Sequence, residues 1–501
     1  MMTTTIFLRC LKPKAMNLRI ISYYIGISLL LVASLMAISA IVAVLSPGDE
    51  SLVPLLYSAA VTALAGCFPL IFVSKKAERL NFKEGNVIVV GSWCFACLFG
   101  MIPYLMYGGQ FSFINALFES VSGFTTTGAS ILNDIDSLPK GLQFWRISTA
   151  WAGGIGIVTL FTSIMSRSFN RNLLSAAEIS QMALQPFDGE RKRFFANRML
   201  VTYLALTLLT IFALRLTGMP WFDSVTNAMS ACSTCGFCNH DASIAFYGSN
   251  AAEIVLTFAM LASGLNFGLL FLSFVRGSNR NLLNSEATRI FLILICIAIA
   301  IICTDLVLEG GYGSAWTALK DAAFQVVSIA TTTGFATKDT NLWPAMSVAV
   351  LIICSLVCGC SGSTSGGIKI DRVLLAMKGI GIKVGSALSP RLVQVVRIDG
   401  EIRPYSQVSD AFGYIFCYLV IIVAAAAVNI AFGLDLTTGI TASIACIGNV
   451  GPGFGEVGSM ANYASFPVVL KFTCLLEMLI GRLEIFPVLY LMRTRGLFIT
   501  S

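Results

Sequence analysis

Charged side chains are scarce in this sequence. Only 12% of its 501 residues are Asp, Glu, Lys or Arg, whereas 56% are hydrophobic. Soluble domains carry roughly 25% charged residues, which cover their surfaces. The shortage excludes an ordinary soluble domain and favours a membrane protein. At least ten apolar runs are long enough, at about 20 residues, to cross a bilayer as helices; the first three are residues 20–44, 53–73 and 87–107.

Groups that carry catalysis or bind nucleotides are also scarce. His240 is the only histidine, and it is expected to be a solvated surface residue beside Asp241. No cluster of buried acid, histidine and nucleophile is recognisable, and no glycine-rich loop has a lysine at the spacing of a phosphate-binding loop. These absences argue against an enzyme and against ATP binding by that route. No cofactor is expected.

Neither the cysteines nor the net charge of the sequence indicates a further function. Most of the 15 cysteines lie inside apolar runs, where cysteine behaves as a small buried hydrophobe rather than as half of a disulfide. Cys232, Cys235 and Cys238 are spaced like iron–sulfur ligands, but no fourth cysteine follows at a suitable spacing, so no transition-metal site is predicted. The net charge of +7 is not gathered on one face and has no accompanying aromatic module, which argues against nucleic-acid binding.

Basic residues indicate the orientation. Lys and Arg are held on the cytoplasmic side of membranes, so their distribution predicts that both termini lie inside. The first apolar run is too long for a secretory signal and lacks a cleavage site, so it is expected to be retained. We expect a multi-pass protein of the cell inner membrane. Most of the 33 Lys and Arg residues lie before residue 20, in 75–83, 167–198, 276–289 and 369–403, and at Arg493 and Arg495.

Four shorter apolar segments cannot cross the membrane. They start near Phe113, Trp221, Trp316 and Leu436, and each offers about a dozen helical residues before it breaks. Non-helical backbone at membrane depth is tolerated where it is buried in protein or lines a water-filled cavity. The segments therefore fit re-entrant pore helices, whose partially negative C-terminal ends favour a cation in a shared cavity.

Each short segment ends in a similar sequence. Four copies recurring at roughly 100-residue intervals indicate one structural unit repeated four times. The unit is expected to contain a span, a pore helix, a loop and a returning span. The four sequences are Thr125-Thr126-Thr127-Gly128, Ser233-Thr234-Cys235-Gly236, Thr331-Thr332-Thr333-Gly334 and Gly448-Asn449-Val450-Gly451. The expected boundaries are 1–80 for the N-terminal tail and two accessory spans, then 81–175, 176–280, 281–385 and 386–501 for pore repeats 1 to 4.

These residue types suit a cation filter. Glycine allows the backbone to turn successive carbonyls toward one axis, and a ring of carbonyls can replace the hydration shell of potassium. Side-chain oxygens two residues before each glycine would add coordination or brace the loops. A single Thr-Thr-Gly would be an ordinary helix end, but four copies in register favour a pore.

The motifs resemble those of the Trk/Ktr/HKT superfamily of cation transporters. The resemblance rests on Phe124–Gly128, on Gly448-Asn449-Val450-Gly451-Pro452-Gly453 and on Gly359-Cys360-Ser361-Gly362-Ser363-Thr364-Ser365-Gly366-Gly367-Ile368-Lys369, and it covers nearly the whole chain. The two spans before the first repeat are similar to the Trk branch. The resemblance implies an all-α polytopic membrane fold, with four span–pore-helix–span repeats in pseudo-four-fold arrangement and two N-terminal accessory helices. It implies potassium uptake through one central filter.

The resemblance also implies the filter residues. A glycine at position 128 goes with potassium selectivity, whereas a serine there goes with sodium preference. The second of the four sequences, Ser233-Thr234-Cys235-Gly236, departs from the family, because Cys235 stands where glycine is common. The implied potassium-binding residues are Thr125, Thr126, Thr127, Gly128, Thr234, Cys235, Gly236, Thr332, Thr333, Gly334, Asn449, Val450 and Gly451.

A glycine- and serine-rich stretch interrupts the returning span of the third unit, where it disfavours a continuous helix. The resemblance implies that it is an intramembrane gate below the filter, contacted by Arg482. The alternatives are a packing kink and, for Arg482, a charge that snorkels to the interface. Glu484 is a candidate partner of Arg482, although an i,i+2 pair lies on different helix faces. The implied gate residues are Gly359, Gly362, Ser363, Thr364, Gly366, Gly367 and Arg482.

Partners follow from the same resemblance. It implies a homodimer above a peripheral cytoplasmic subunit that binds nucleotides and regulates transport. The basic segments 167–198 and 369–403 are candidate docking surfaces, or they only orient the chain or meet anionic lipid. A sodium-permeable protein, or a symporter of the same fold coupled to Na⁺ or H⁺, is the alternative function. An inverted-repeat transporter is less favoured, because all four loops are expected to enter from outside.

Overall fold

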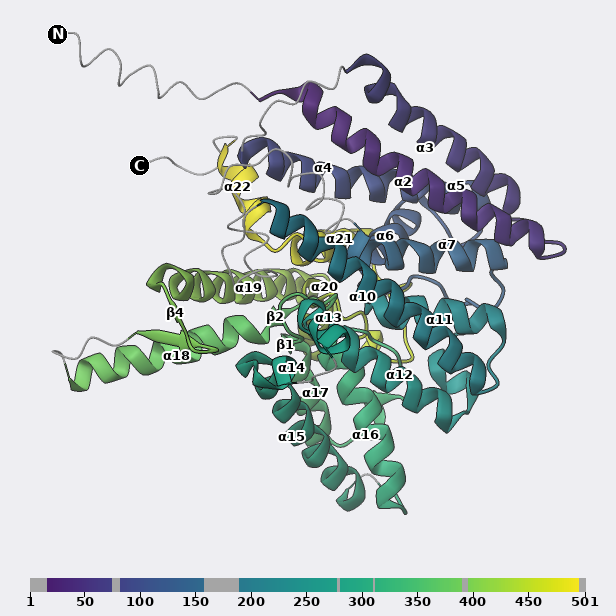
Figure 1. The fold of residues 1–501 in the computed structure, drawn as a ribbon. Coiled ribbons are helices and arrows are strands. Elements are labelled where there is room, and N and C mark those ends of the chain that lie inside the picture. The colour runs from purple at the N-terminus through teal and green to yellow at the C-terminus, as the bar shows by residue number, and fades with distance from the viewer. Residues whose placement is uncertain are drawn as a thin grey trace, which may run out of the picture.

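The computed structural model describes residues 16–73, 82–156, 189–276, 280–309, 311–389 and 395–494. Helices dominate these residues (Figure 1), so the expected helical membrane protein is confirmed. Within the described ranges, six helices are long and apolar enough to span a membrane, and a seventh span results if the bent pair α12–α13 counts as one. This is fewer than the ten expected, because several apolar runs are broken.

Two accessory helices precede the repeats. α2 (Leu18–Leu45) and α3 (Leu52–Phe72) lie side by side at one edge of the molecule (Figure 1). They approach closely at Gly26 and Gly66, where a Cβ on either glycine would lie closer than 3.0 Å to the other's carbonyl oxygen. Small residues at such crossings allow tight helix packing in membranes. α2 also contacts α4 and α7, so the pair packs onto the first repeat.

Each repeat then begins with a long helix and a short one. The short helices start where the sequence predicts, except that α16 starts one residue before Trp316. The long helices are α4 (Phe82–Gly100), α10 (Gly189–Leu216), α15 (Glu286–Leu308) and α19 (Tyr405–Ala431). The short helices, called pore helices below, are α6 (Phe113–Phe124), α11 (Trp221–Ser233), α16 (Ala315–Ala330) and α20 (Leu436–Gly448).

The returning helix is interrupted in all four repeats. The first passes from an α-helix into a π-helix, the second bends by 108°, and the third and fourth are split by loops. Except for α18, which has 19 residues but carries four charged ones, each half is shorter than a full span, which explains the low number of continuous spans. The segments are α7 (Lys140–Trp151) with η1 (Ala152–Gly156), α12 (Asn250–Ser263) with α13 (Phe267–Arg276), α17 (Ala345–Leu356) with α18 (Ile370–Leu388), and α21 (Val468–Arg482) with α22 (Phe486–Thr494).

Strands and the remaining short helices are minor elements. Parallel strands β1 (Val357–Cys358) and β2 (Ile368–Lys369) close the base of the loop between α17 and α18. Antiparallel β3 (Val396–Ile398) and β4 (Glu401–Arg403) lie between α18 and α19. The short helices are α5 (Ile102–Tyr107), α14 (Arg280–Asn284), η2 (Ser243–Tyr247), η3 (Thr340–Leu342) and η4 (Gly455–Val457).

Candidate functional site

All four pore helices end in the same backbone motif. One residue adopts the left-handed conformation, and the N–H of the next donates to the carbonyl five residues earlier, which is the hydrogen-bonding pattern of a Schellman motif. Glycine usually fills the left-handed position, but here Thr or Asn does, so the repeated glycine is not the helix cap. The left-handed residues are Thr126 (φ +53°), Thr234 (+55°), Thr332 (+58°) and Asn449 (+52°). The bonds are Thr127 to Ser122 (2.9 Å), Cys235 to Ser230 (3.1 Å), Thr333 to Ser328 (2.8 Å) and Val450 to Ala445 (2.9 Å).

The four repeated glycines close a ring. Each has positive φ, between +80° and +95°, a region that L side chains rarely adopt. A Cβ on each would also lie closer than 3.0 Å to a carbonyl oxygen of the next loop. The fourth loop touches the first, so the predicted filter residues of all four repeats meet around one point. The contacts join Gly128 to Cys235, Gly236 to Thr333, Gly334 to Val450 and Gly451 to Thr127.

Side chains brace this ring unequally. Below, loops 1 to 4 are residues 125–128, 233–236, 331–334 and 448–451. In loop 1 the hydroxyl groups of Thr125 and Thr127 are 2.7 Å apart, and the corresponding pair in loop 3 is 2.8 Å apart. The Asn449 amide of loop 4 donates to the Thr127 hydroxyl and to the Met478 carbonyl, both at 3.0 Å. Asn449 therefore braces loop 1 through its amide nitrogen and not through the side-chain oxygen that the sequence suggested, and ion coordination stays a prediction.

The glycine- and serine-rich stretch lies against three of the four loops. We call residues 359–367 the intramembrane loop. Its Gly366 N–H donates to the Thr332 hydroxyl of loop 3 (2.9 Å), and its Thr364 hydroxyl donates to the Cys232 carbonyl at the end of α11 (3.1 Å). A Cβ on Gly366 would lie closer than 3.0 Å to the Gly448 carbonyl of loop 4. The predicted gate residues are thus next to the predicted filter.

The bend between α12 and α13 holds the other side of this loop. Backbone hydrogen bonds join Cys360 N–H to the Gly264 carbonyl (2.9 Å) and Phe267 N–H to the Gly362 carbonyl (3.0 Å). The Asn266 amide donates to the Ser361 carbonyl (2.7 Å). The broken helix therefore exchanges backbone bonds with the loop. Sequence reasoning missed this contact, although a Gly and an Asn inside an apolar run were a signal.

Arg482 ends α21 and links two repeats. Its guanidinium donates to the Thr364 carbonyl of the intramembrane loop (2.9 Å) and to the Gly153 and Gly154 carbonyls of η1 (2.6 and 2.9 Å). These bonds point into the bundle, which argues against a charge that snorkels to the interface. The structure brings Arg482 to the predicted gate, as expected.

Glu484 has other partners than the sequence suggested. It forms ion pairs with Lys369 (3.4 Å) and with Arg372, which follow the intramembrane loop. Glu484 and Ile485 both have positive φ, +63° and +51°, which is strained for residues other than glycine. The strained break between α21 and α22 is therefore tied to the base of the loop.

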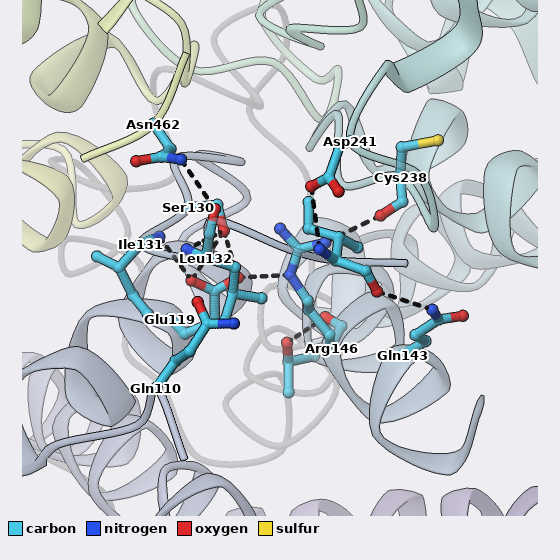
Figure 2. A network of polar contacts seen from close by, with 12 residues as sticks. Gln110, Glu119, Ser130, Ile131, Leu132, Gln143, Arg146, Cys238, Asp241 and Asn462 are labelled. Carbon is cyan, nitrogen blue, oxygen red and sulfur yellow. Dashed lines mark hydrogen bonds and ion pairs between the residues drawn. The ribbon is translucent and has the colours of Figure 1, made fainter. Parts of the chain in front are cut away.

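A buried ion pair lies behind loops 1 and 2 (Figure 2). It joins Glu119 of α6 to Arg146 of α7, whose side chains are 0% and 2% exposed. Glu119 also accepts hydrogen bonds from the Ser130 hydroxyl (3.1 Å) and the Ile131 N–H (3.2 Å), just after loop 1. Both residues are charges inside apolar segments, which is the signal that sequence reasoning did not use.

Arg146 carries the connection on to the second repeat. It donates to the Cys238 carbonyl (3.0 Å), as Figure 2 shows, and its guanidinium lies 3.7 Å from the Phe237 ring centroid. Arg146 therefore holds the chain after loop 2 against Glu119 and the chain after loop 1. We call this pair the Glu119–Arg146 brace.

A charged contact outside the brace also joins repeats 1 and 2. His240, expected to be solvated, is 19% exposed; it pairs with Asp136 and stacks on Phe246 with ring centroids 3.5 Å apart. Partial burial alone would raise the pKa of Asp136, but hydrogen bonds from His240 and from the Asp241 N–H outweigh it and lower the pKa below the usual value. His240 is thus partly buried rather than fully solvated, because its ring stacks on Phe246 and its Nδ1 pairs with Asp136.

Comparisons with known proteins agree with this geometry. The TrkH family model, described as cation transport protein, matches residues 55–495. The Trk system potassium uptake protein TrkH of Salmonella typhimurium is 33% identical over 83% of this chain and 86% of its own. TrkH of Vibrio parahaemolyticus is 31% identical over 95% of this chain and 99% of its own. The crystal structure of the potassium transporter TrkH from Vibrio parahaemolyticus superimposes with a TM-score of 0.86 at 30% identity, covering 95% and 98% of the two chains.

Proposed function

Because this chain belongs to the TrkH family of cation transport proteins, we propose that it takes up potassium across the cell inner membrane through one central pore. It is a multi-pass membrane transporter and not an enzyme. The observation that carries the proposal is the closed ring in which each of the four glycines touches a carbonyl of the next loop. A ring of inward carbonyls is the arrangement that can replace the hydration shell of potassium.

Four equivalent repeats would form the filter. The left-handed residues and glycines have nearly equal φ in all four loops, which supports a pseudo-four-fold pore built from repeats 81–175, 176–280, 281–385 and 386–501. The ligands would be the thirteen loop residues named from the sequence. A sodium-permeable protein, or a symporter coupled to Na⁺ or H⁺, remains the alternative, and relative ion fluxes separate the two.

The intramembrane loop would act as the gate. Its contacts with Thr332, Cys232 and Gly448 support a position directly against the filter loops. Arg482 would hold it closed, because the guanidinium binds the Thr364 carbonyl and the carbonyls of η1 together. A fixed positive charge there would also repel a cation until the loop moves.

Orientation and partners are further parts of the proposal. Both termini would lie in the cytoplasm, as the basic residues suggest. The protein would form a homodimer and bind a peripheral cytoplasmic subunit that carries the nucleotide. Of the two basic segments suggested for docking, most of 167–198 lies outside the described residues, while the described part of 369–403 includes α18, β3 and β4.

The first experiment tests uptake and Arg482 together. A bacterium that lacks its own potassium uptake is grown on limiting potassium with the parent chain, Arg482→Ala, or the exposed control Arg289→Ala. We expect the parent and the control to restore growth and potassium influx, and Arg482→Ala to change the influx. Absence of influx, despite verified membrane expression and co-expression of the cytoplasmic subunit, would contradict potassium uptake.

A second experiment tests the gate. Deleting Gly362–Gly367 removes the part of the loop that touches Thr332 and loop 4. Basal potassium flux should rise, because the barrier below the filter is lost. If the flux falls while the protein stays monodisperse in detergent, the stretch supports the structure and does not gate the pore.

A further inference from the structure

Three side chains that can bind a metal ion lie close together near loop 4. Cys446 lies on α20, and Cys474 and Glu477 lie one helical turn apart on α21, so both face the pore helix. The two Sγ atoms and a Glu477 carboxylate oxygen all lie within 4.8 Å of one another. The cysteines are 0% exposed and Glu477 is 2% exposed. The cluster is therefore built of buried groups from two helices that contact each other.

Only one of the two carboxylate oxygens of Glu477 has a hydrogen-bond partner among the described residues. Oε1 accepts a hydrogen bond from the Ser443 hydroxyl, which places the side chain. Oε2 is buried and has no hydrogen-bond partner among the described residues. A buried polar atom without a partner is costly, and more so if it is charged. A carboxylate oxygen of Glu477 lies beside the two thiols, and one oxygen of this group lacks a partner, which points to a cation as the missing partner.

We propose that Cys446, Cys474 and Glu477 bind a divalent transition-metal ion of the zinc class. Two sulfur donors and one carboxylate form a set that zinc accepts with a fourth position open, whereas calcium, magnesium and potassium prefer oxygen. The ion binds the thiolate and carboxylate forms, so the two thiols and the Glu477 carboxyl each release their proton to solvent, and the site with a divalent ion carries one net negative charge.

This site differs from what cysteine spacing predicted. The sequence drew attention to Cys232, Cys235 and Cys238, but in the structure Cys232 faces Thr210 (Sγ to Oγ1, 3.7 Å) and Cys238 faces Asn227 (Sγ to Oδ1, 3.5 Å). The proposed ligands come from separate helices, so no short motif marks them. The proposal therefore departs from the expectation of no transition-metal site.

Tyr463 connects the proposed metal site to loop 4. The Tyr463 hydroxyl lies 4.0 Å from the Cys446 Sγ and donates to the Gly451 carbonyl at 2.9 Å. A metal at Cys446 would remove the proton that this thiol donates to Tyr463, so its binding would change the contacts of Tyr463 next to the loop-4 glycine. The ion would be a structural clamp between α20 and α21, separate from any ion that moves through the pore.

The test is the metal content of the purified protein, with its affinity tag removed and no chelator added. We expect about one zinc ion per chain by mass spectrometry of the metal, because the three ligands are buried and come from two packed helices. Cys474→Ala and Glu477→Gln should lower the content by at least about ten-fold. Cys232→Ala, which removes an equally buried thiol from α11, should leave it unchanged.

A second measurement covers variants that fold poorly. Chains from zinc-depleted cells are incubated with Cd²⁺, and the ultraviolet absorption of cadmium–thiolate bonds is recorded on the monodisperse fraction. The parent should show it and Cys446→Ala should not. The proposal is overturned if the parent contains less than about a tenth of a zinc per chain and shows no such absorption, or if Cys232→Ala lowers both signals as much as Cys474→Ala. Neither readout depends on transport.

Discussion

Loops 1 and 3 have different side chains from loops 2 and 4, yet all four have the same backbone. Loops 1 and 3 each pair two threonine hydroxyls, whereas loops 2 and 4 have Cys235 and Val450 where the second threonine would be. The φ angles and the bonds to the carbonyl five residues earlier nonetheless agree. The four loops share one backbone conformation although their side chains differ, so the left-handed residue and the glycine set the geometry.

The contacts just beyond the ring also differ from one pair of repeats to the other. Repeats 1 and 2 are joined by the Glu119–Arg146 brace and by Asp136 with His240. Just after their loops, repeats 3 and 4 are joined by uncharged groups, for example Thr340 N–H to the Ser459 hydroxyl (3.0 Å), whereas their ion pairs, Glu484 with Lys369 and Arg372, lie at the base of the intramembrane loop. We call the contacts just after the loops the charged seam for repeats 1 and 2 and the uncharged seam for repeats 3 and 4.

The largest effect on ion selectivity is expected where a substitution disturbs the backbone that the four loops share. Gly128→Ser places a side chain against the Cys235 carbonyl at φ +80° and puts a hydroxyl among the carbonyls. Discrimination between potassium and sodium should fall by about ten-fold or more, which corresponds to about 1.4 kcal/mol. Relative fluxes of the two ions in vesicles measure this.

Gly108→Ala is the matched control. Gly108 also has φ +80°, but nothing lies within 4 Å of its added Cβ. Only a backbone penalty of about 1–2 kcal/mol in stability is expected, with unchanged selectivity. Equal selectivity changes in both variants would show that contact within the ring is not the cause.

The largest effect on stability is expected at the charged seam, with a much smaller one at the uncharged seam. Arg146→Met leaves Glu119 buried without its partner, which typically costs about 3–5 kcal/mol. Thr340→Val removes the Thr340 hydroxyl, which donates to the Ser459 hydroxyl (3.2 Å) at the uncharged seam, and should cost only about 1 kcal/mol. Thermal unfolding in detergent measures both. The double variant Glu119→Gln with Arg146→Met should recover part of the loss; if it is no better than Arg146→Met alone, the buried charge is not the reason.

A smaller effect distinguishes loop 1 from loop 3. The Thr127 hydroxyl meets both Thr125 and Asn449, whereas the hydroxyl of Thr333 meets Thr331. Thr127→Val should therefore be less stable than Thr333→Val by about 1 kcal/mol. The melting temperatures of the two variants measure this difference, and equal values would mean that Asn449 does not brace loop 1.

Local patterns predicted the repeats well. The pore helices start within one residue of the predicted positions, because their apolar runs are short and end in a marked sequence. The four glycines end four similar sequences at the same position, which predicted that they would lie around one shared pore. The contact of Arg482 with the intramembrane loop came from the family resemblance, since a single charge in an apolar run does not name its partner.

The rest depends on contacts that sequence spacing does not encode. The bend after Ser263 lies in an apolar run that reads as one span, and backbone bonds to the intramembrane loop satisfy its broken turn. Glu119 and Arg146 belong to different helices, so their pairing is set by packing. The i,i+2 spacing of Arg482 and Glu484 already disfavoured a pair, and the loop residues Lys369 and Arg372 bind the glutamate.

The smallest effect concerns pH at the charged seam. Because the pKa of Asp136 is lowered from 3.8 in the folded protein, its contacts stabilise the fold above about pH 4 and are lost as the pH falls through the folded pKa. Its side chain is 47% exposed, so Asp136→Asn should cost less than about 1 kcal/mol. The difference in melting temperature from the parent should be present at pH 7 and shrink toward pH 3. Ser459→Ala, at the uncharged seam, should cost the same at both pH values; a parallel decline there would mean that acid loosens the whole ring and not one carboxylate.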